Sequence, residues 1–232
     1  MTEISSKEIL SNYNLIKESV GEAKNVKIIA VSKTHSFKII QNAFDCGIRI
    51  FGENYAQEFR DKIVNFQNKK YNDIEWHFIG HLQSNKVKYL APYVTYIHSV
   101  DSIKLAEEIS KQAIKNNRII KILVQVNTSG EISKSGCQKE DLNDILKSIK
   151  DFQNIEVVGL MTIAGLEGTE EKTKEEFGLL KLLLEKTNKE LKLNLTELSM
   201  GMTGDFEMAI KEGATMIRIG TAIFGNRNYN LG

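Results

Sequence analysis

Short β-branched runs alternate regularly with longer segments of helical periodicity along this chain, and this alternation constrains the fold more than any other feature. A leading helix is expected over about residues 5–20, and eight such runs follow it, each with a helix-like stretch after it. The expected strands are Val26–Val31, Arg49–Phe51, Glu75–Ile79, Thr95–Ile97, Lys121–Val126, Glu156–Leu160, Glu197–Ser199 and Met216–Ile219. Repeated βα units of this kind predict a parallel sheet.

The length of the chain favours one of the two architectures that such units can build. The chain has 232 residues; without about 25 leading residues, roughly 207 remain for eight units of about 26 each, which fits a closed barrel of about 200–250 residues. A doubly wound open sheet is the alternative. No linker rich in proline, glycine or serine divides the sequence. We therefore predict an α/β fold, a single (β/α)8 TIM-barrel domain over residues 1–232 in which residues 1–25 form an N-terminal helical extension.

The balance of charge excludes several classes of partner. Lysine and arginine number 31 against 30 acidic residues, so no long-range field attracts nucleic acid or an anionic membrane surface. No run reaches the roughly 18 apolar residues that cross a bilayer, and the two cysteines, Cys46 and Cys137, make no disulfide framework. We expect a cytoplasmic protein that binds small molecules, with no nucleic acid or membrane as a partner.

Lys33 stands at the expected mouth of the barrel, where the carboxyl ends of the strands meet. It follows the largely apolar run Lys27–Val31, so its amine should emerge at the edge of the core, where desolvation lowers the pKa of a lysine. A partly neutral amine can attack an aldehyde. The alternative is an ordinary surface lysine at a strand end, and position alone does not decide between the two.

The loops after the last two expected strands are typical of a phosphate-binding site. Glycines there permit close backbone approach, helix N-termini favour an anion, and barrels often bind phosphate at this place. The alternative is that the glycines only form tight turns. The residues concerned are Gly201, Gly204, Gly220 and Gly225, together with the hydroxyls of Ser199 and Thr221.

Arg218 and the histidines are the other polar candidates. Arg218 stands between two isoleucines on the last expected strand, where alternation points either it or both of its neighbours into the barrel. An ion pair with a carboxylate of the barrel wall is the alternative to a ligand contact.

The four histidines lack metal-ligand spacing, so no metal site is predicted. Only His81, in the polar loop Gly80–Lys86, is retained as a candidate contact at the mouth.

Two further polar segments are expected to lie outside the strands. His98–Asp101 should form a loop at the mouth after the fourth strand. Glu167–Glu176 should form the solvated first turns of a helix, where carboxylates also suit the positive end of the helix dipole. We assign no chemistry to the acidic segment.

Eight segments, in order along the chain, together resemble one protein family. They are AVSKTH, FGENYAQE, WHFIGHLQSNK, HSVD, VNTSGEISKSGC, GLMTIAG, LSMGMTGDFEMAI and IRIGTAIFGNRNY. With these segments the chain resembles the YggS/PROSC family of pyridoxal phosphate (PLP) homeostasis proteins over about residues 26–229. Because the segments coincide with the expected loops at the barrel mouth, the resemblance is far more specific than a single glycine motif.

The resemblance implies a PLP-binding barrel of fold type III, similar to the N-terminal domain of alanine racemase. Lys33, the lysine of AVSKTH, would carry the cofactor PLP as a Schiff base. Arg218 would face the pyridine nitrogen, and Asn54 would lie beside the ring. The remaining residues implied are Ser199, Gly220 and Thr221 for the phosphate and Met200, Gly201 and Met161 along the pocket wall. The sequence departs from the family at Thr203-Gly204, where relatives more often carry serine and a non-glycine residue.

In function, the resemblance implies a PLP-binding protein of intracellular vitamin B6 homeostasis that holds the cofactor without catalytic turnover, since the family has no established activity. PLP-dependent apoenzymes are candidate recipients, and a monomer is expected. The alternative is an enzyme like an amino-acid racemase, because bound PLP can acidify an α-carbon. Alanine racemase, however, takes its second acid/base group from an additional β domain, whereas this chain ends seven residues after Gly225.

A third class is a barrel enzyme that acts on a sugar phosphate without a cofactor. It would use the same phosphate-binding loops but would not account for the AVSKTH segment. Any of the enzymes would need a general base, and the expected mouth offers Tyr55, His81 and Asp205.

Overall fold

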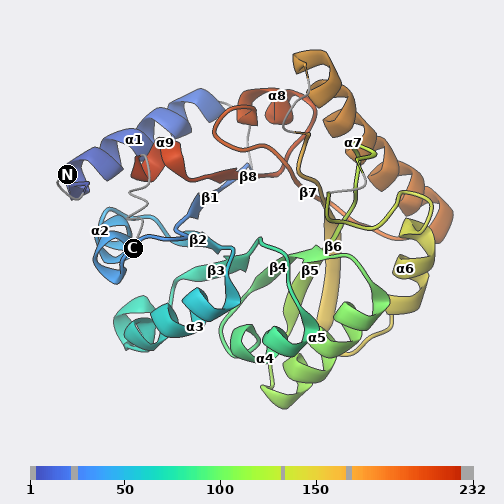
Figure 1. Ribbon diagram of the computed structural model, residues 1–232, viewed down its shortest axis with the longest axis horizontal. Coiled ribbons are helices and arrows are strands. Elements are labelled where there is room, and N and C mark those ends of the chain that lie inside the picture. The colour runs from blue at the N-terminus through green and yellow to red at the C-terminus, as the bar shows by residue number, and fades with distance from the viewer. Residues whose placement is uncertain (1–3, 22–25, 132–133, 166–168, 226–232) are drawn as a thin grey trace.

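The strands form a closed barrel. The computed structural model describes residues 4–21, 26–131, 134–165 and 169–225, and within them eight parallel strands pair in sequence order, with β1 pairing with β8. They are β1 (Lys27–Val31), β2 (Ile50–Glu53), β3 (Glu75–Phe78), β4 (Tyr96–Val100), β5 (Ile120–Gln125), β6 (Ile155–Met161), β7 (Glu197–Ser199) and β8 (Met216–Ile219). The strands lie at the centre of Figure 1 with helices around them. The predicted (β/α)8 barrel is therefore confirmed, and the open sheet is excluded.

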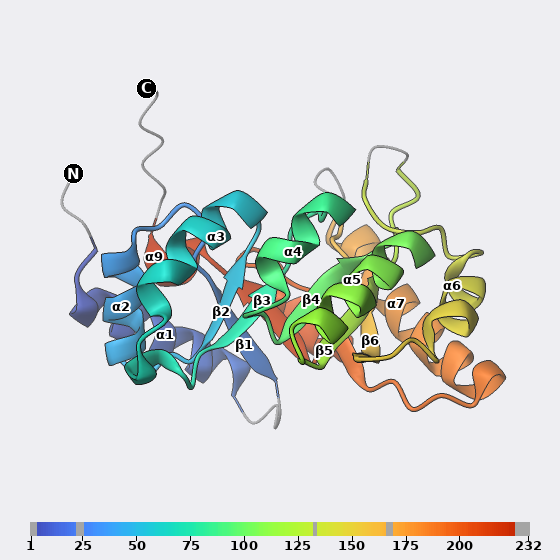
Figure 2. The same cartoon turned by 90° about the horizontal axis from the view of Figure 1, so that it is seen from below.

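Helices follow the strands and form the outer layer. They are α1 (Ser6–Val20), α2 (Phe37–Asp45), α3 (Ala56–Ile63), α4 (Val87–Leu90), α5 (Ile103–Lys115), α6 (Leu142–Ile149), α7 (Glu170–Leu191), α8 (Phe206–Lys211) and α9 (Thr221–Phe224), with short 3-10 turns at Val64–Phe66, Lys69–Tyr71 and Ser84–Lys86. Figure 2 shows α3, α4 and α5 side by side along one flank of the barrel. In the described part of the chain, no helix is both long and apolar enough to cross a membrane.

The leading helix α1 lies where the sequence predicts it. Its N-cap Ser5 accepts a hydrogen bond from the N–H of Glu8, and the Glu8 carboxylate accepts one from the N–H of Ser5, which makes a capping box. α1 packs against α2 and α9, and the side-chain amide of Asn12 donates to the Ile223 carbonyl at 3.1 Å. Residues 1–3 and 22–25 of the expected extension lie outside the described residues. The helix thus holds α9, which begins directly after the last barrel strand.

The core has two parts, and Arg218 belongs to the inner one. The larger part lies between the strands and the helices and includes Ile217 and Ile219. The smaller part lies inside the barrel and consists of Ile29, Tyr96, Leu123, Met161 and Met216. Because side chains alternate along a strand, Arg218, two residues after Met216, points into the barrel while the isoleucines on either side of it pack outward.

β4 is longer than the sequence predicts. The expected strand ends at Ile97, but β4 continues to Val100 and all five of its residues are buried. The prediction of a mouth loop at His98–Asp101 is therefore wrong for its first three residues. A polar residue does not end a strand when its buried atoms have partners, and both ring nitrogens of His98 have hydrogen-bond partners inside the barrel.

The acidic segment before and within α7 is only partly solvated. α7 begins at Glu170, and its first turn is exposed, whereas Glu167 lies outside the described residues. Glu176 is 4% exposed, and its Oε2 accepts a hydrogen bond from the N–H of Gly165 at 2.8 Å. The prediction of a solvated segment is therefore wrong at Glu176, because helical periodicity puts this residue on the same face as the buried Leu180.

Gly159 lies where the barrel strands β6 and β7 approach each other closely. It pairs with Glu197 of β7, and a Cβ at Gly159 would overlap the Glu197 backbone. We expect Gly159→Ala to lower the free energy of unfolding by about 1–3 kcal/mol or more, measured by urea denaturation. Gly178→Ala in α7 is the matched control, because a Cβ there meets only a carboxylate oxygen of Glu212 at 3.5 Å; it should stabilise by about 0.5–1 kcal/mol. Equal effects of the two changes would contradict this account.

Candidate functional site

A cavity of about 220 Å³ lies at the carboxyl ends of the strands, where the sequence predicts the site. Five of the site residues that the family resemblance implies line it: Lys33, Asn54, Arg218, Gly220 and Thr221. They come from three neighbouring strands and their loops, since β1 lies between β8 and β2 in the barrel. The structure thus brings together a lysine amine, an amide, a guanidinium and a glycine-containing loop.

Apolar residues that the sequence did not single out complete the cavity wall. Val31, Ile79 and Ile163 stand at or just beyond the ends of β1, β3 and β6, and Met202 follows β7. Their signal in the sequence is only their position at a strand end, which many core residues share. Thr203 and Gly204 also line the cavity, so the place where the chain departs from the family pattern belongs to the site, and Gly204 lies where a phosphate loop was expected.

The backbone before Lys33 is held by a buried ion pair. Ser32 donates its hydroxyl to Oε1 of Glu53 at 2.6 Å. Lys62 donates to the two carboxylate oxygens of Glu53 at 3.0 and 3.2 Å and to the Ser32 carbonyl at 2.8 Å. Burial raises the pKa of Glu53, and Lys62 acts in the opposite direction. A buried, paired carboxylate therefore fixes the end of β1 from which Lys33 enters the cavity.

The residue after Lys33 is held by the same group of charges. Thr34 has a φ of 66°, in the left-handed region, which costs a non-glycine residue about 1–3 kcal/mol. Its N–H donates to Oε1 of Glu58 at 2.5 Å, and Glu58 also pairs with Lys62. The turn that directs Lys33 is thus stabilised on both sides by carboxylates that share one lysine.

Arg218 brings a buried positive charge to the cavity. It is 4% exposed, and it donates from Nη1 to Oγ of Ser199 at 2.8 Å and from Nη2 to the Thr162 carbonyl at 2.9 Å. Across the described ranges, no carboxylate forms an ion pair with it. Burial lowers the pKa of Arg218 to about 10, while Asp205 acts in the opposite direction. Arg218 therefore stays charged at neutral pH.

Ser199 lies behind Arg218 rather than in the cavity lining. Its side chain is fully buried, and its hydroxyl is 2.8 Å from Nη1 of Arg218 and 2.8 Å from Nδ1 of His98. Both hydrogen-bonding directions of the hydroxyl are thus taken by protein atoms. The Ser199 hydroxyl thus contacts Arg218 and His98, which the sequence could not show because it does not reveal where a buried hydroxyl points.

The other expected residues are placed next to the cavity or away from it. Met161 and Met200 are fully buried in the core. Gly201 has a φ of 88°, and a Cβ there would overlap Cβ of Ala209, so the turn and its packing require glycine. His81 is exposed and is not part of the cavity lining. None of these four residues reaches the cavity in the described structure.

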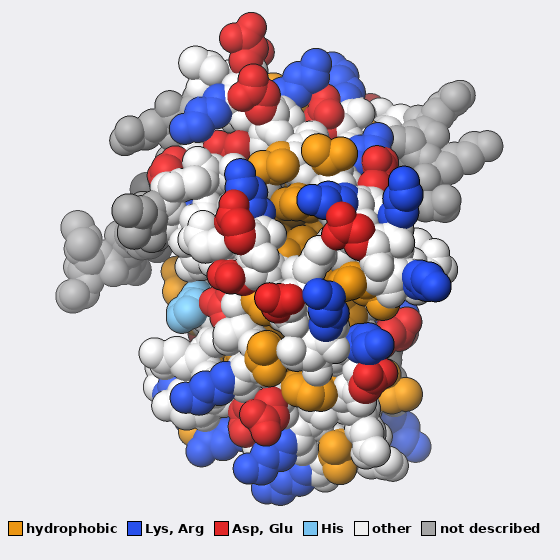
Figure 3. All heavy atoms as spheres, turned by 90° about the vertical axis from the view of Figure 1, so that its right-hand side faces the viewer, with side chains coloured by type: hydrophobic (Ala, Val, Ile, Leu, Met, Phe, Trp, Pro, Cys, Tyr) orange, Lys and Arg blue, Asp and Glu red, His pale blue; other side chains and the backbone are white. Residues whose placement is uncertain are grey.

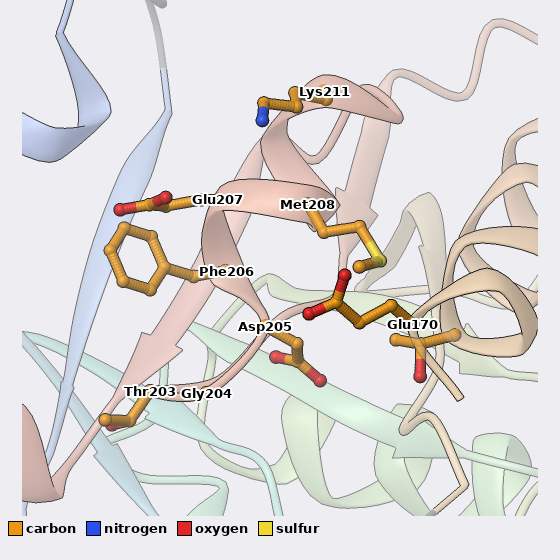
Figure 4. Close-up of a pocket in the computed structure, with 9 residues that line it drawn as sticks. Glu170, Thr203, Gly204, Asp205, Phe206, Glu207, Met208 and Lys211 are labelled. Atoms are coloured by element: carbon orange, nitrogen blue, oxygen red, sulfur yellow. The ribbon is translucent and has the colours of Figure 1, made fainter. Parts of the chain in front are cut away.

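A second pocket of about 530 Å³ adjoins the cavity, since Thr203 and Gly204 line both. Figure 4 shows these two residues on the loop that leads into α8. The charged residues of the pocket are Glu170, Asp205, Glu207 and Lys211. Three carboxylates against one amine disfavour an anion, so the smaller cavity with Arg218 is the better place for an anionic group.

Metal ligands and general bases do not converge on the cavity in the described residues. No group of three or more His, Cys, Asp or Glu side chains could hold a metal ion there. Tyr55 is 54% exposed. Asp205 lines the neighbouring pocket and accepts a hydrogen bond from the N–H of Met202 at 2.5 Å. Of the described cavity-lining residues, Lys33 carries the one side chain that can act as a base.

Lys62→Met tests the ion pair behind Lys33. Because the change leaves the Glu53 carboxylate buried without its partner, we expect the free energy of unfolding to fall by about 3–5 kcal/mol at pH 8. Burial already raises the pKa of Glu53, and removal of Lys62 raises it further. A raised pKa in the folded state means that stability falls as pH rises, so the deficit should be smaller at pH 5.

Two variants serve as controls for Lys62→Met, with urea denaturation at both pH values as the measurement. Lys70→Met breaks the half-exposed pair with Asp45 and should change stability by less than about 1 kcal/mol. Adding Glu53→Gln to Lys62→Met should recover part of the loss because the buried charge is gone. A deficit in Lys62→Met that does not depend on pH would refute this account.

The chain matches known proteins along nearly its whole length. The family model described as alanine racemase, N-terminal domain, matches residues 4–228. The pyridoxal phosphate homeostasis protein of Aquifex aeolicus is 43% identical over 222 residues, which cover 95% of this chain and 96% of the relative. The protein of the same name from Escherichia coli is 38% identical over 231 residues, which cover 96% of this chain and 98% of the relative.

Solved structures agree with the sequence matches. PipY of Synechococcus elongatus with PLP bound superimposes with a TM-score of 0.86 at 35% identity, over 94% of this chain and 100% of PipY. An alanine racemase of Clostridium difficile superimposes with a TM-score of 0.80 at 15% identity, over 98% of this chain and 59% of the racemase, and shares the fold alone. The chain therefore belongs to the family of pyridoxal phosphate homeostasis proteins, within the wider alanine racemase N-terminal domain family.

Proposed function

We propose that this chain binds PLP in the cavity, as a Schiff base on Lys33, and that it acts in intracellular PLP homeostasis. The observation that carries the proposal is the convergence of Lys33, Arg218 and the loop Gly220-Thr221 on one cavity of about 220 Å³. A lysine amine can attack an aldehyde, and a buried cation beside glycine loops suits an anionic ligand. The family supports this proposal, since its members are named for PLP homeostasis and the structure of PipY contains PLP.

Asn54 provides a test of whether the cavity fits a polar ligand of this kind. Its side-chain oxygen Oδ1 is buried and has no hydrogen-bond partner in the described structure. An unpaired buried acceptor costs about 1–3 kcal/mol, which a donor on a bound ligand would recover. A Cβ at Gly80 would overlap the Asn54 backbone, so Gly80 lets this loop pack where Asn54 reaches the cavity. The residues present thus fit a ring with polar substituents.

The polar side chains and loops of the cavity would contact different parts of the cofactor. When bound, PLP supplies an aldehyde that condenses reversibly with an amine. Lys33 would provide that amine, and Arg218, being charged, would hold the pyridine nitrogen as a hydrogen-bond donor that cannot protonate it. The loops at Thr203-Gly204 and Gly220-Thr221 offer backbone N–H groups and hydroxyls to the phosphate. We assign Ser199 to Arg218 instead of to the phosphate, because its hydroxyl is already shared within the protein.

We further propose that the protein holds PLP without turnover. An arginine at the ring nitrogen weakens the ring as an acceptor of electrons, because the nitrogen stays unprotonated. Racemisation needs two acid/base groups on opposite faces of the substrate, and the candidates Tyr55, His81 and Asp205 do not line the cavity. Storage and release of the cofactor require only the reversible reaction with Lys33.

PLP-dependent apoenzymes are the proposed recipients, and the proposed working form is a cytoplasmic monomer built as one domain. In Figure 3, basic and acidic side chains are interspersed over the face that carries α6 and α7, with no large region of one sign. Nothing on this face favours nucleic acid.

Both cysteines are free thiols, and burial raises the pKa of Cys137 to about 12, so this thiol is unreactive and suits a reducing compartment.

Lys33→Ala tests the covalent attachment. Wild-type protein mixed with PLP should show a visible absorption band and, after borohydride reduction, a phosphopyridoxyl group on the peptide that contains Lys33, detected by mass spectrometry. Lys33→Ala should lose both. Lys38→Ala, which changes an exposed lysine at the start of α2, should be labelled like the wild type. Labelling that persists in Lys33→Ala would refute the proposed site.

Deuterium exchange separates storage from catalysis. With PLP bound, the protein should exchange the α-proton of L-alanine in D2O no faster than free PLP does, as followed by NMR, because the cavity offers no second base. Faster exchange that Tyr55→Phe or Asp205→Asn reduces would support the racemase-like alternative and count against a purely non-catalytic role.

A further inference from the structure

A chain of four hydrogen bonds crosses the inside of the barrel and ends at Arg218. Nη1 of Arg218 is 2.8 Å from Oγ of Ser199, which is 2.8 Å from Nδ1 of His98. Nε2 of His98 is 2.8 Å from Nδ1 of His77, and Nε2 of His77 is 2.8 Å from Oε1 of Glu75. The three middle residues are at most 1% exposed. The chain, which we call the relay, thus links β8, β7, β4 and β3 without contact with solvent in its middle.

The two ends of the relay determine the direction of every hydrogen bond in it. A guanidinium can only donate and a carboxylate can only accept. Since Arg218 donates to Ser199, the Ser199 hydroxyl is left to donate to Nδ1 of His98. Since Glu75 accepts from Nε2 of His77, a neutral His77 must accept at Nδ1 from Nε2 of His98. Both imidazoles therefore carry their proton on Nε2, and each middle residue gives one proton and receives one.

The protonation states agree with this direction. Burial lowers the pKa of His77 and, more strongly, that of His98, so both rings are neutral at pH 7. The hydrogen bond from His77 lowers the pKa of Glu75, which stays a carboxylate. The charged and titratable groups that face the two rings from the surrounding strands are Lys27, Glu75, Tyr96, Lys121, Glu197 and Arg218.

A protonated His77 would break the pattern. It would donate at both nitrogens, so His98 would have to accept at Nε2 and donate from Nδ1. Oγ of Ser199 would then receive protons from both His98 and Arg218, and its own proton would lack the acceptor that it has in the neutral state. Only the neutral relay gives each proton an acceptor.

We propose that His98 and His77 are positioning residues for the cofactor site, which act as a one-way relay from Arg218 to Glu75 and keep Ser199 available as the acceptor that holds Arg218 in the cavity. The inference rests on the proposed function only for the identity of the ring that Arg218 meets. Arg218 has no carboxylate partner of its own among the described residues, and hydrogen bonds in a chain polarise one another. The relay thus connects this cation to the negative charge of Glu75 on the other side of the barrel.

The first test measures the two tautomers in the apoprotein. Nitrogen-15 NMR of the imidazoles should show His98 and His77 protonated at Nε2 and bare at Nδ1. This pattern should persist as pH falls from 8 through the ordinary histidine pKa of about 6.5, because burial lowers both pKa values. A proton on Nδ1 of His98, or titration of His98 near its ordinary pKa, would overturn the proposal. The result does not depend on PLP binding.

The second test compares variants with PLP bound. His98→Leu removes the acceptor of Ser199, so the dissociation constant for PLP should rise at least tenfold and the pH dependence of the visible band should change. His98→Gln keeps one acceptor and one donor in the same place and should restore most of both properties. Tyr96→Phe is the matched control, because the Tyr96 hydroxyl lies inside the same barrel, accepts from Lys27 at 2.9 Å and is not part of the relay. It should bind PLP within twofold of wild type.

Each outcome of these measurements supports or refutes the positioning role of the relay. Equal affinity and equal pH dependence in His98→Leu and wild type would refute the positioning role, and so would equal losses in His98→Leu and His98→Gln. Where His98→Leu does not fold, Ser199→Ala takes its place, since it removes the hydroxyl and leaves both histidines intact. Wild-type protein that binds no PLP would refute the proposed function, and the tautomers in the apoprotein would still decide whether the relay exists.

Discussion

The guanidinium of Arg218 is a full positive charge buried inside the barrel. Such a charge needs hydrogen-bond acceptors, which an apolar interior does not supply. TIM barrels are usually filled by branched apolar side chains. Here, beside such apolar side chains, the interior also contains a hydroxyl and two imidazoles in line with Arg218, with a carboxylate at the far end. The polar residues inside the barrel and the proposed cofactor site therefore depend on each other, because removing Arg218 would leave its buried acceptors without a donor.

A second buried charge lies on the other side of the cavity. Glu53 is fully buried, and Lys62 connects it to the end of β1 just before Lys33. The cavity thus lies between a group of charges that holds the lysine loop and a cation that reaches the cavity itself. Both are buried and hydrogen bonded, so the side chains that we propose for PLP binding are held in place by buried groups of the barrel.

Much of this could be predicted from the sequence, and the failures have a common cause. Strand ends in a parallel barrel converge, so a lysine after an apolar strand and a glycine loop after the last strand were expected to meet, as Lys33 and Gly220 do. The predictions were wrong at polar residues that were expected to lie at the surface and that the structure buries. His98 seemed to end a strand and Glu176 seemed solvated, because a sequence shows that a group is polar but not which atom satisfies it.

The relay also has a consequence for how the barrel interior responds to electric fields. As in ice, each hydrogen bond of the relay contains one proton. Inverting a single hydrogen bond therefore leaves either two protons facing each other or no proton between two acceptors. Repairing such a defect requires a change at the neighbouring links as well, because each middle residue donates one proton and accepts one. The dipoles of the relay therefore keep one direction when a ligand binds or leaves. A change of charge in the cavity does not require the hydrogen bonds inside the barrel to reorient.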